Sequence, residues 1–358
     1  MNKKINHKQL TFAREYRGYT QTRLASEIPG LSQSNLSKFE KGIPTLSDEL
    51  IYKIIKFLDF PEDFLYLELY TKSINAHYRK KSKILKTEKI ELDQTIKIIS
   101  HLIDEMSESL DLPEFGLQQI DVEDGYSPSY IASYVRRRLN LRDKPVKDIF
   151  SILESQGIII VPINTDINSF DGVSFITEYG FPVMVINDNM SNDRKRLTIA
   201  HELGHIIMHS EDFLISEFRD KEKEAFEFAA EFLMPEVAIK NQLMNLKLSE
   251  LVGLKRYWLT SIASLIRRAR DLKCIDQDRY IYFNTELSRS GYKKKEPVEV
   301  VIDKPTIIKS AYELYTTQLD YSATELSDVF NLPLDIIQKF FASHSEKNKL
   351  RIISMNIS

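Results

Sequence analysis

The chain has 358 residues, 42% hydrophobic and 10% aromatic, so we expect about two or three folded domains and exclude a disordered polymer. The net charge of −3 is uneven: residues 1–60 carry +4 and the remainder −7, which fits a small N-terminal module that meets a polyanion. The single cysteine, Cys274, excludes an internal disulfide and a cysteine-based zinc cluster. Without a signal-peptide core or an apolar stretch of membrane-spanning length, we expect a cytoplasmic protein with no membrane partner.

Short helical patterns run from Lys8 to about Tyr70. TQTRLASEI leads into a turn at Pro29 and Gly30, and Ser32 is a good N-cap for the next helix, SQSNLSKFEKG. Two short helices joined by a tight glycine-containing turn are the plan of a helix-turn-helix, although a helical bundle that binds protein fits the pattern as well. The second helix would present polar side chains able to read base edges or hold phosphate: Gln33, Ser34, Asn35, Ser37 and Lys38.

RGYTQTRLASEIPGLSQSNLSKFEKGIPTLSDELIYKIIKFLDFP resembles the helix-turn-helix of the Cro/cI (XRE) repressor family. The resemblance covers roughly the first 65 residues and implies a five-helix domain that binds double-stranded DNA, with a homodimer as one option. The turn from Ala25 to Gly30 is one residue longer than the commonest family version, with Pro29 in the extra place.

A charged segment follows, and its start, HYRKKSKILKTEK, could touch DNA phosphates. The favoured interpretation of this basic run is a solvated helix that links two domains, and the rest of residues 71–112 is amphipathic. YIASYVRRRLNL and VKDIFSILESQG predict two further helices, the second ended by Gly157. GIIIVPIN, DGVSFITEYG and PVMVIND then predict three strands with a hairpin-like turn, and an edge strand of such a sheet can hold an extended substrate by backbone pairing.

The stretch RKRLTIAHELGHIIMH contains HELGH, a match to the H-E-x-x-H pattern of helical zinc sites. On a helix, His201 and His205 lie one turn apart on one face and can grip a single Zn²⁺. Glu202 lies at the edge of that face, where it is placed as a general base and not as a ligand. Apolar residues fill the opposite side, which predicts a mostly buried helix with one polar strip facing a cavity. A helix with two stray histidines is the alternative.

A catalytic zinc site needs a third protein ligand, and EKEAFEFAAEFLMP downstream offers several carboxylates. Helical phase places Glu222 on an inward face, where a carboxylate calls for a metal or a cation, so we predict it as the third ligand. His209 is predicted at the rim of the site or behind its ligands. The same inward face is apolar: Ala225, Phe226, Ala229 and Leu233. The other glutamates fall on the outer face and are predicted to be ordinary surface residues: Glu224, Glu227 and Glu231.

These two motifs, with DGVSF, Asn187 and SIASLIRRARDLKCIDQDRY, make residues 113–297 similar to the ImmA/IrrE family of bacterial and phage metallopeptidases. The resemblance implies a zincin-like domain of the gluzincin type. It implies Zn²⁺ bound by His201, His205 and Glu222, with Glu202 as the catalytic acid and base. Phe226 departs from the family, in which many members have Asn. Members cleave repressors inside cells or act as stress-response and antitoxin-like regulators, often fused to XRE domains.

We therefore predict a mainly α-helical α+β protein with four regions: a helix-turn-helix domain at 1–70, a helical linker at 71–112, a metallopeptidase domain at 113–297 and a C-terminal helical region at 298–358. Within the last region, TELSDVFNLPLDIIQKFF looks like another helix-turn-helix. Its second helix offers Asp335, Gln338 and Lys339 with little positive charge, which favours packing or protein interaction over DNA reading.

The predicted function is a DNA-binding transcriptional regulator with a zinc-dependent endopeptidase domain that cleaves a repressor or another regulatory protein. The alternative is a non-proteolytic XRE regulator, or an antitoxin with a toxin partner, in which the zinc site is structural or sensory. The complete His-Glu-His-Glu set favours the first, because a structural site has no need of Glu202.

Overall fold

The computed structural model describes residues 4–69, 85–167, 169–210 and 213–342. The chain divides into two compact units, Met1–Leu69 with Thr306–Ser358, and Tyr70–Pro305. Most of the basic run predicted to link domains, residues 77–84, lies outside the described residues. None of the described helices combines the length and apolar content that a membrane crossing requires.

The N-terminal part of the first unit is a set of short helices around a small apolar core that includes Leu10, Leu24 and Leu36. The side-chain hydroxyls of Thr20, Ser32 and Ser47 cap the N-termini of three of these helices. Of these caps, that of Ser32 was predicted. The fifth helical element is a 3₁₀ helix. The elements are α1 (His7–Tyr16), α2 (Gln21–Glu27), α3 (Gln33–Glu40), α4 (Asp48–Phe57) and η1 (Glu62–Tyr66).

The C-terminal part of the first unit is also helical: α14 (Ile307–Glu313), a π-helical turn (Leu314–Gln318), α15 (Ala323–Phe330) and α16 (Leu334–Ala342). Asp335 at the start of α16 accepts two hydrogen bonds, at 2.6 and 3.0 Å, from the guanidinium of Arg17, the C-cap residue of α1. The Arg17 hydrogen bond holds the pKa of Asp335 below its usual value. Asp335 therefore serves packing within this unit.

The second unit is built on a three-stranded mixed sheet in the order β1-β3-β2, with strands β1 (Ile159–Ile163), β2 (Gly172–Ile176) and β3 (Pro182–Asn187). The central strand β3 is parallel to β1 and antiparallel to β2, with Gly172 opposite Ile186 in the hairpin. All six residues of β3 are buried. The three predicted strands and the hairpin are confirmed, and β2 is an edge strand.

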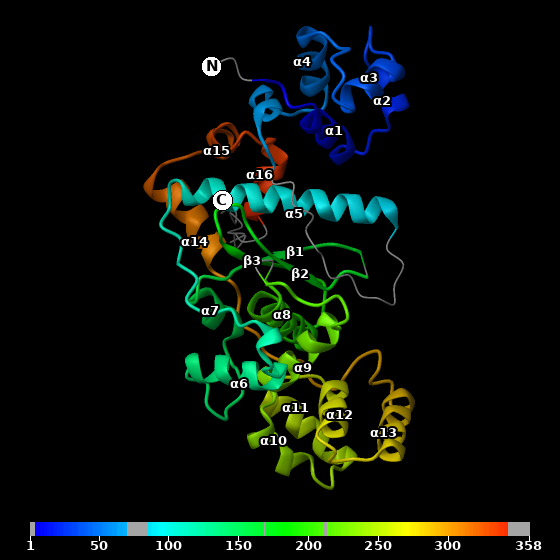
Figure 1. The fold of residues 1–358 in the computed structure, drawn as a ribbon, viewed down its shortest axis with the longest axis vertical. Helices are drawn as coiled ribbons and strands as arrows, with labels where there is room; N and C mark the ends of the chain where they lie inside the picture. Colours follow the sequence, from blue (N-terminus) through cyan, green and yellow to red (C-terminus); the bar gives the residue numbers. More distant parts are fainter. Residues whose placement is uncertain (1–3, 70–84, 168, 211–212, 343–358) are drawn as a thin grey trace, which may run out of the picture. The chain divides into compact units, whose positions relative to one another are not determined.

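Both faces of this sheet are covered by helices. Helix α5 (Lys86–Ser107) runs across one face, opposite α8 (Asn192–Met208) on the other (Figure 1). Asp104 of α5 accepts hydrogen bonds from the backbone of the β2–β3 turn, at Glu178 and Tyr179. The amphipathic pattern expected after the basic run corresponds to the apolar stripe of this helix, whose buried residues are Leu92, Ile96, Ile99, Leu102, Ile103 and Met106.

The remaining helices gather on the α8 side of the sheet (Figure 1). They are α6 (Pro128–Arg138), α7 (Ile149–Glu154), α9 (Lys221–Leu233), α10 (Glu236–Leu243), α11 (Leu251–Trp258), α12 (Ile262–Asp271) and α13 (Gln277–Arg289), with 3₁₀ turns at Val122–Asp124 and Leu248–Glu250. One continuous core joins their apolar faces to Ile160, Met184 and Ile186 of the sheet. The predicted fold class, mainly α with a small β-sheet, is confirmed.

Candidate metal centre

Helix α8 carries the HELGH motif and is buried along most of its length. It follows Ser191 and ends at Met208, with His209 as its C-cap. His201, Glu202 and His205 are 7%, 2% and 5% exposed. Polar side chains buried to this extent need partners, because an uncompensated polar group in a core is destabilising.

The glycine of the motif sets how closely the next helix approaches. A Cβ at Gly204 would lie 3.2 Å from the Phe228 ring and 3.3 Å from the Ala225 Cα, tighter than ordinary contacts. Glycine therefore lets α9 pack almost backbone to backbone on α8. Glu222 precedes Ala225 by three residues, so the same close packing carries its carboxylate to the histidine pair.

Three side chains converge as potential ligands, each offering one atom within 4.8 Å of the others: His201, His205 and Glu222. The two Nε2 atoms are 3.1 Å apart, and the Glu222 carboxylate oxygens lie 3.6 Å from His201 Nε2 and 3.3 Å from His205 Nε2. Two imidazoles and a carboxylate are a ligand set that zinc takes in catalytic sites, so these residues fit a metal ion. No other cluster of this kind occurs among the described residues.

Glu202 points to the edge strand of the sheet. The Ser174 hydroxyl on β2 donates a hydrogen bond of 2.7 Å to Glu202 Oε2. Strand and helix can come this close because Gly172, two residues earlier on the same face, has no side chain: a Cβ there would lie 2.6 Å from Thr198 Cγ2. Sequence reasoning missed Ser174. The signal was the alternation in DGVSF, which puts Gly172 and Ser174 on one side of the strand.

His209 lies directly behind His205. Its Nδ1 is 2.9 Å from His205 Nδ1, and its Nε2 is 2.9 Å from Glu224 Oε2. Arg219 in turn donates from Nε to Glu224 Oε1 at 2.8 Å. Glu224 is thus no ordinary surface residue, and that prediction is wrong. By contrast, His201 Nδ1 is buried and makes no hydrogen bond within the described part of the chain, and the His201 ring packs on Phe226 at 4.2 Å.

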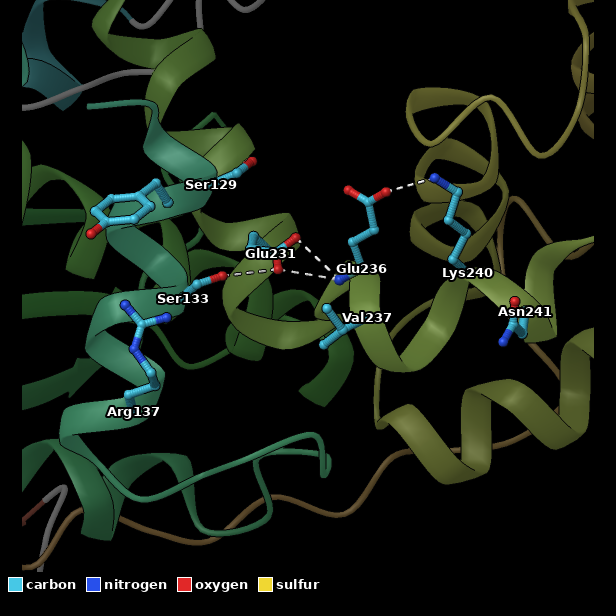
Figure 2. A pocket seen from close by; sticks show the side chains of 9 residues that line it. Ser129, Ser133, Arg137, Glu231, Glu236, Val237, Lys240 and Asn241 are labelled. Carbon is cyan, nitrogen blue, oxygen red and sulfur yellow. Dashed lines mark hydrogen bonds and ion pairs between the residues drawn. The ribbon is translucent and has the colours of Figure 1, made fainter. Parts of the chain in front are cut away.

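The prediction for Glu231 is also wrong, because it is only 5% exposed. Its carboxylate pairs with Arg268. Figure 2 shows that it also accepts from Ser133 Oγ, at 3.1 Å, and from the backbone N–H of Glu236, at 3.2 Å. It forms part of the wall of a cavity of about 520 Å³ between α6 and α10, which contains none of the predicted metal ligands.

Helix α9 presents a different face to the core from the one predicted. Phe226, assigned to the inward face, is 52% exposed, whereas Phe228 and Phe232 are fully buried. The cause is that α9 packs on α6 as well as on α8. The middle of its buried face is therefore rotated around the helix away from Glu222. Glu222 itself lies at the edge of that face, with its side chain 25% exposed. Of the outer glutamates, Glu227 is exposed and accepts a hydrogen bond from Ser129, as a surface residue would.

In the first unit, the five residues predicted to contact DNA all lie on α3. Four are exposed and Ser37 is half-buried. Gln33 donates to Gln21 at 2.9 Å, and Gln21 donates to Glu40 at 2.7 Å, so the start of α3 is tied to α2. Their role in binding stays a prediction.

Fold and site together define a helix-turn-helix module joined to a metallopeptidase-like domain, in which an HExxH helix meets a carboxylate from the next helix. Residues 153–270 match a peptidase family described as the IrrE N-terminal-like domain. Residues 12–65 match a family described as helix-turn-helix. The chain therefore joins an XRE-type helix-turn-helix domain to an ImmA/IrrE-like domain, as the motifs predicted. No curated protein matches the chain.

Proposed function

We propose that the chain is a DNA-binding regulator whose second unit is a zinc-dependent endopeptidase. The observation that carries the proposal is the convergence of His201, His205 and Glu222 beside the buried carboxylate of Glu202. The helix-turn-helix match supports DNA binding, and the peptidase-family match supports a bound metal ion and a protein substrate.

Zinc, when bound by the three ligands, supplies a Lewis acid that polarises the scissile carbonyl and makes water easier to deprotonate. Glu202 takes the proton from the attacking water and returns it to the amine that leaves. The Ser174 hydroxyl donates to Oε2 of Glu202, which limits rotation of the carboxylate that moves the proton. Burial of Glu202 at 2% exposure keeps bulk water away from that proton.

The substrate is proposed to bind as an extended segment along β2. Among the described strands, β2 pairs only with β3, so its outer edge has backbone groups available for a peptide. Because Ser174 lies on this strand and contacts Glu202, a segment paired with β2 would run past the metal centre. An exposed loop or linker of a repressor or another regulatory protein is a substrate of this form.

A matched pair of proteins tests catalysis: the zinc-loaded wild type and Glu202→Gln, each incubated with a proteome-derived peptide library. New peptide ends with the wild type, and none with Glu202→Gln at equal zinc content, would support the proposal. Identical peptide patterns from both would sink the endopeptidase. That outcome would favour a non-proteolytic regulator or antitoxin in which the metal is structural or sensory.

A further inference from the structure

The two histidines of the metal centre are supported in different ways. His205 is backed by a continuous line of polar contacts through His209 and Glu224 to Arg219, with successive separations of 2.9, 2.9 and 2.8 Å. The His209 side chain is 2% exposed and that of Glu224 is 15% exposed, so this line is shielded from water. His201 has no such line, since its Nδ1 makes no hydrogen bond within the described residues.

The chemistry of the groups fixes the direction of every hydrogen bond in the line. A His205 ring that offers the Nε2 lone pair to a metal carries its proton on Nδ1, and so donates to His209 Nδ1. His209 must then accept at Nδ1 and carry its own proton on Nε2, from which it donates to the Glu224 carboxylate. Arg219 donates to the same carboxylate and holds its charge in place. Each group therefore selects the tautomer of the next.

The same line ties together the two helices that supply the ligands. His209 is the C-cap of α8, Glu224 lies in the first turn of α9, and Arg219 lies in the segment between them. Glu222 is two residues from Glu224 on α9. The orientation of His205 and the position of the α9 carboxylate are consequently fixed by one set of contacts.

We propose that His209, Glu224 and Arg219, together termed the His209 chain, are positioning residues that hold His205 in the tautomer and ring orientation needed to bind zinc. This inference rests on the proposed metal centre. Partners behind a ligating histidine typically change metal affinity by about 10–100-fold when they are removed. The His209 chain therefore sets how tightly the protein holds zinc.

The test compares zinc affinity, measured by competition with a chromophoric chelator, in the full-length wild type and four variants. His209→Leu keeps volume but removes both hydrogen bonds, and we expect about 10–100-fold weaker binding. His209→Gln keeps an acceptor and a donor, and we expect it to recover most of that loss. Arg219→Gln, at a partly exposed position, should weaken binding by only a few-fold. Glu227→Gln on the outer face of α9 is the matched control and should bind as the wild type does.

A second readout separates positioning from folding. Cobalt(II) absorption reports ligand geometry, and we expect His209→Leu to change the spectrum and His209→Gln to restore it. Thermal unfolding of the metal-free proteins shows whether each variant is folded. If His209→Leu does not fold, the zinc affinity of Arg219→Gln still tests the proposal. Equal affinities and spectra in all variants would overturn the His209 chain alone. A wild type that binds no zinc would overturn the metal centre as well.

Discussion

Ser174 and Glu202 are joined by a hydrogen bond of 2.7 Å, although one lies on an edge strand and the other in the middle of a buried helix. The contact links the strand proposed to hold the substrate to the carboxylate proposed to move the proton. Gly172 makes it feasible, since any side chain there would meet Thr198 on the same helix.

Replacement of Ser174 by Ala should lower the rate of peptide cleavage about 10–100-fold without loss of zinc. A hydrogen bond to a charged group is typically worth about 1.5–3 kcal/mol, and about 1.4 kcal/mol corresponds to tenfold in rate. The measurement is kcat on a peptide identified with the wild type. Ser129→Ala, which removes a hydroxyl bound to the exposed Glu227, is the control. An unchanged kcat in Ser174→Ala would contradict a positioning role.

Replacement of Glu222 by Ala should abolish stoichiometric zinc binding, because it removes the carboxylate of the proposed ligand set. Glu227→Ala, on the outer face of the same helix, should retain zinc. The zinc content of the two variants is compared by elemental analysis after dialysis against a weak chelator. Full zinc occupancy in Glu222→Ala would mean that the ion is held elsewhere.

Gly172→Ala should destabilise the second unit by about 1–3 kcal/mol, because the new methyl group would overlap Thr198 Cγ2. For a unit of this size, each kcal/mol lowers the Tm by roughly 2–4 °C. Thr198→Ser removes the clashing methyl, so the double variant should regain much of the loss. Denaturant unfolding of both single variants and the double variant measures this coupling, and purely additive effects would count against the proposed overlap.

Lys255→Met should destabilise the protein by about 3–5 kcal/mol near pH 7, and by less near about pH 3, below the ordinary pKa of Asp193. Lys255 is 2% exposed and binds the carboxylates of Asp193, at 2.9 Å, and Glu296, at 2.5 Å. Burial alone would raise the pKa of Asp193, but hydrogen bonds from Ser191 and Lys255 outweigh it and lower that pKa. The stabilisation from Asp193 is thus present above its ordinary pKa and is lost as the pH falls through the lowered value.

Urea unfolding of metal-free protein at the two pH values checks this prediction. Without Lys255, the buried carboxylates are unpaired when ionised, and protonation in acid relieves the penalty. Lys240→Met removes a similar but exposed pair with Glu236 and should leave stability nearly unchanged at both pH values. If Lys255→Met destabilised the protein more in acid than near pH 7, this prediction would be contradicted.

Lys38→Ala should weaken binding to double-stranded DNA and reduce the slope of log affinity against log salt by about one. The residue is exposed on α3, and its charge is predicted to meet phosphate. Fluorescence anisotropy with a duplex selected from a random pool measures affinity at several salt concentrations. Lys247→Ala, exposed in the second unit, should leave both quantities unchanged. Absence of binding at low salt by the wild type would count against a DNA-binding role.

Local patterns were enough to predict the three strands, the buried HELGH helix and the capped start of α3, because each depends on residues close together in the chain. The phase of α9 was not predictable in the same way. The prediction centred the inward face of α9 on Glu222. In the structure, α9 packs on α6 as well as on α8, and this packing buries Phe228 and Glu231. An amphipathic pattern shows that a helix has a buried side but not how many neighbours share it.

The supporting contacts of the site were the least accessible to sequence reasoning. Ser174 reaches Glu202 across 28 positions of the chain, and Glu224 reaches His209 across 15. Serine on a strand and glutamate on a helix are common, and no spacing in the sequence indicates which residue either of them contacts. The HExxH pattern, in contrast, encodes its geometry in the helical repeat itself.

The first unit contains both ends of the chain, since it takes in Met1–Leu69 and resumes at Thr306. In the sequence, the metallopeptidase-like unit is therefore inserted between the two segments that form the first unit. A fragment that stops after Leu69 deprives Arg17 of its partner Asp335. Cleavage anywhere between Tyr70 and Pro305 would leave the two halves of the first unit associated only through non-covalent contacts. DNA binding by such a nicked protein would report how strongly those contacts hold.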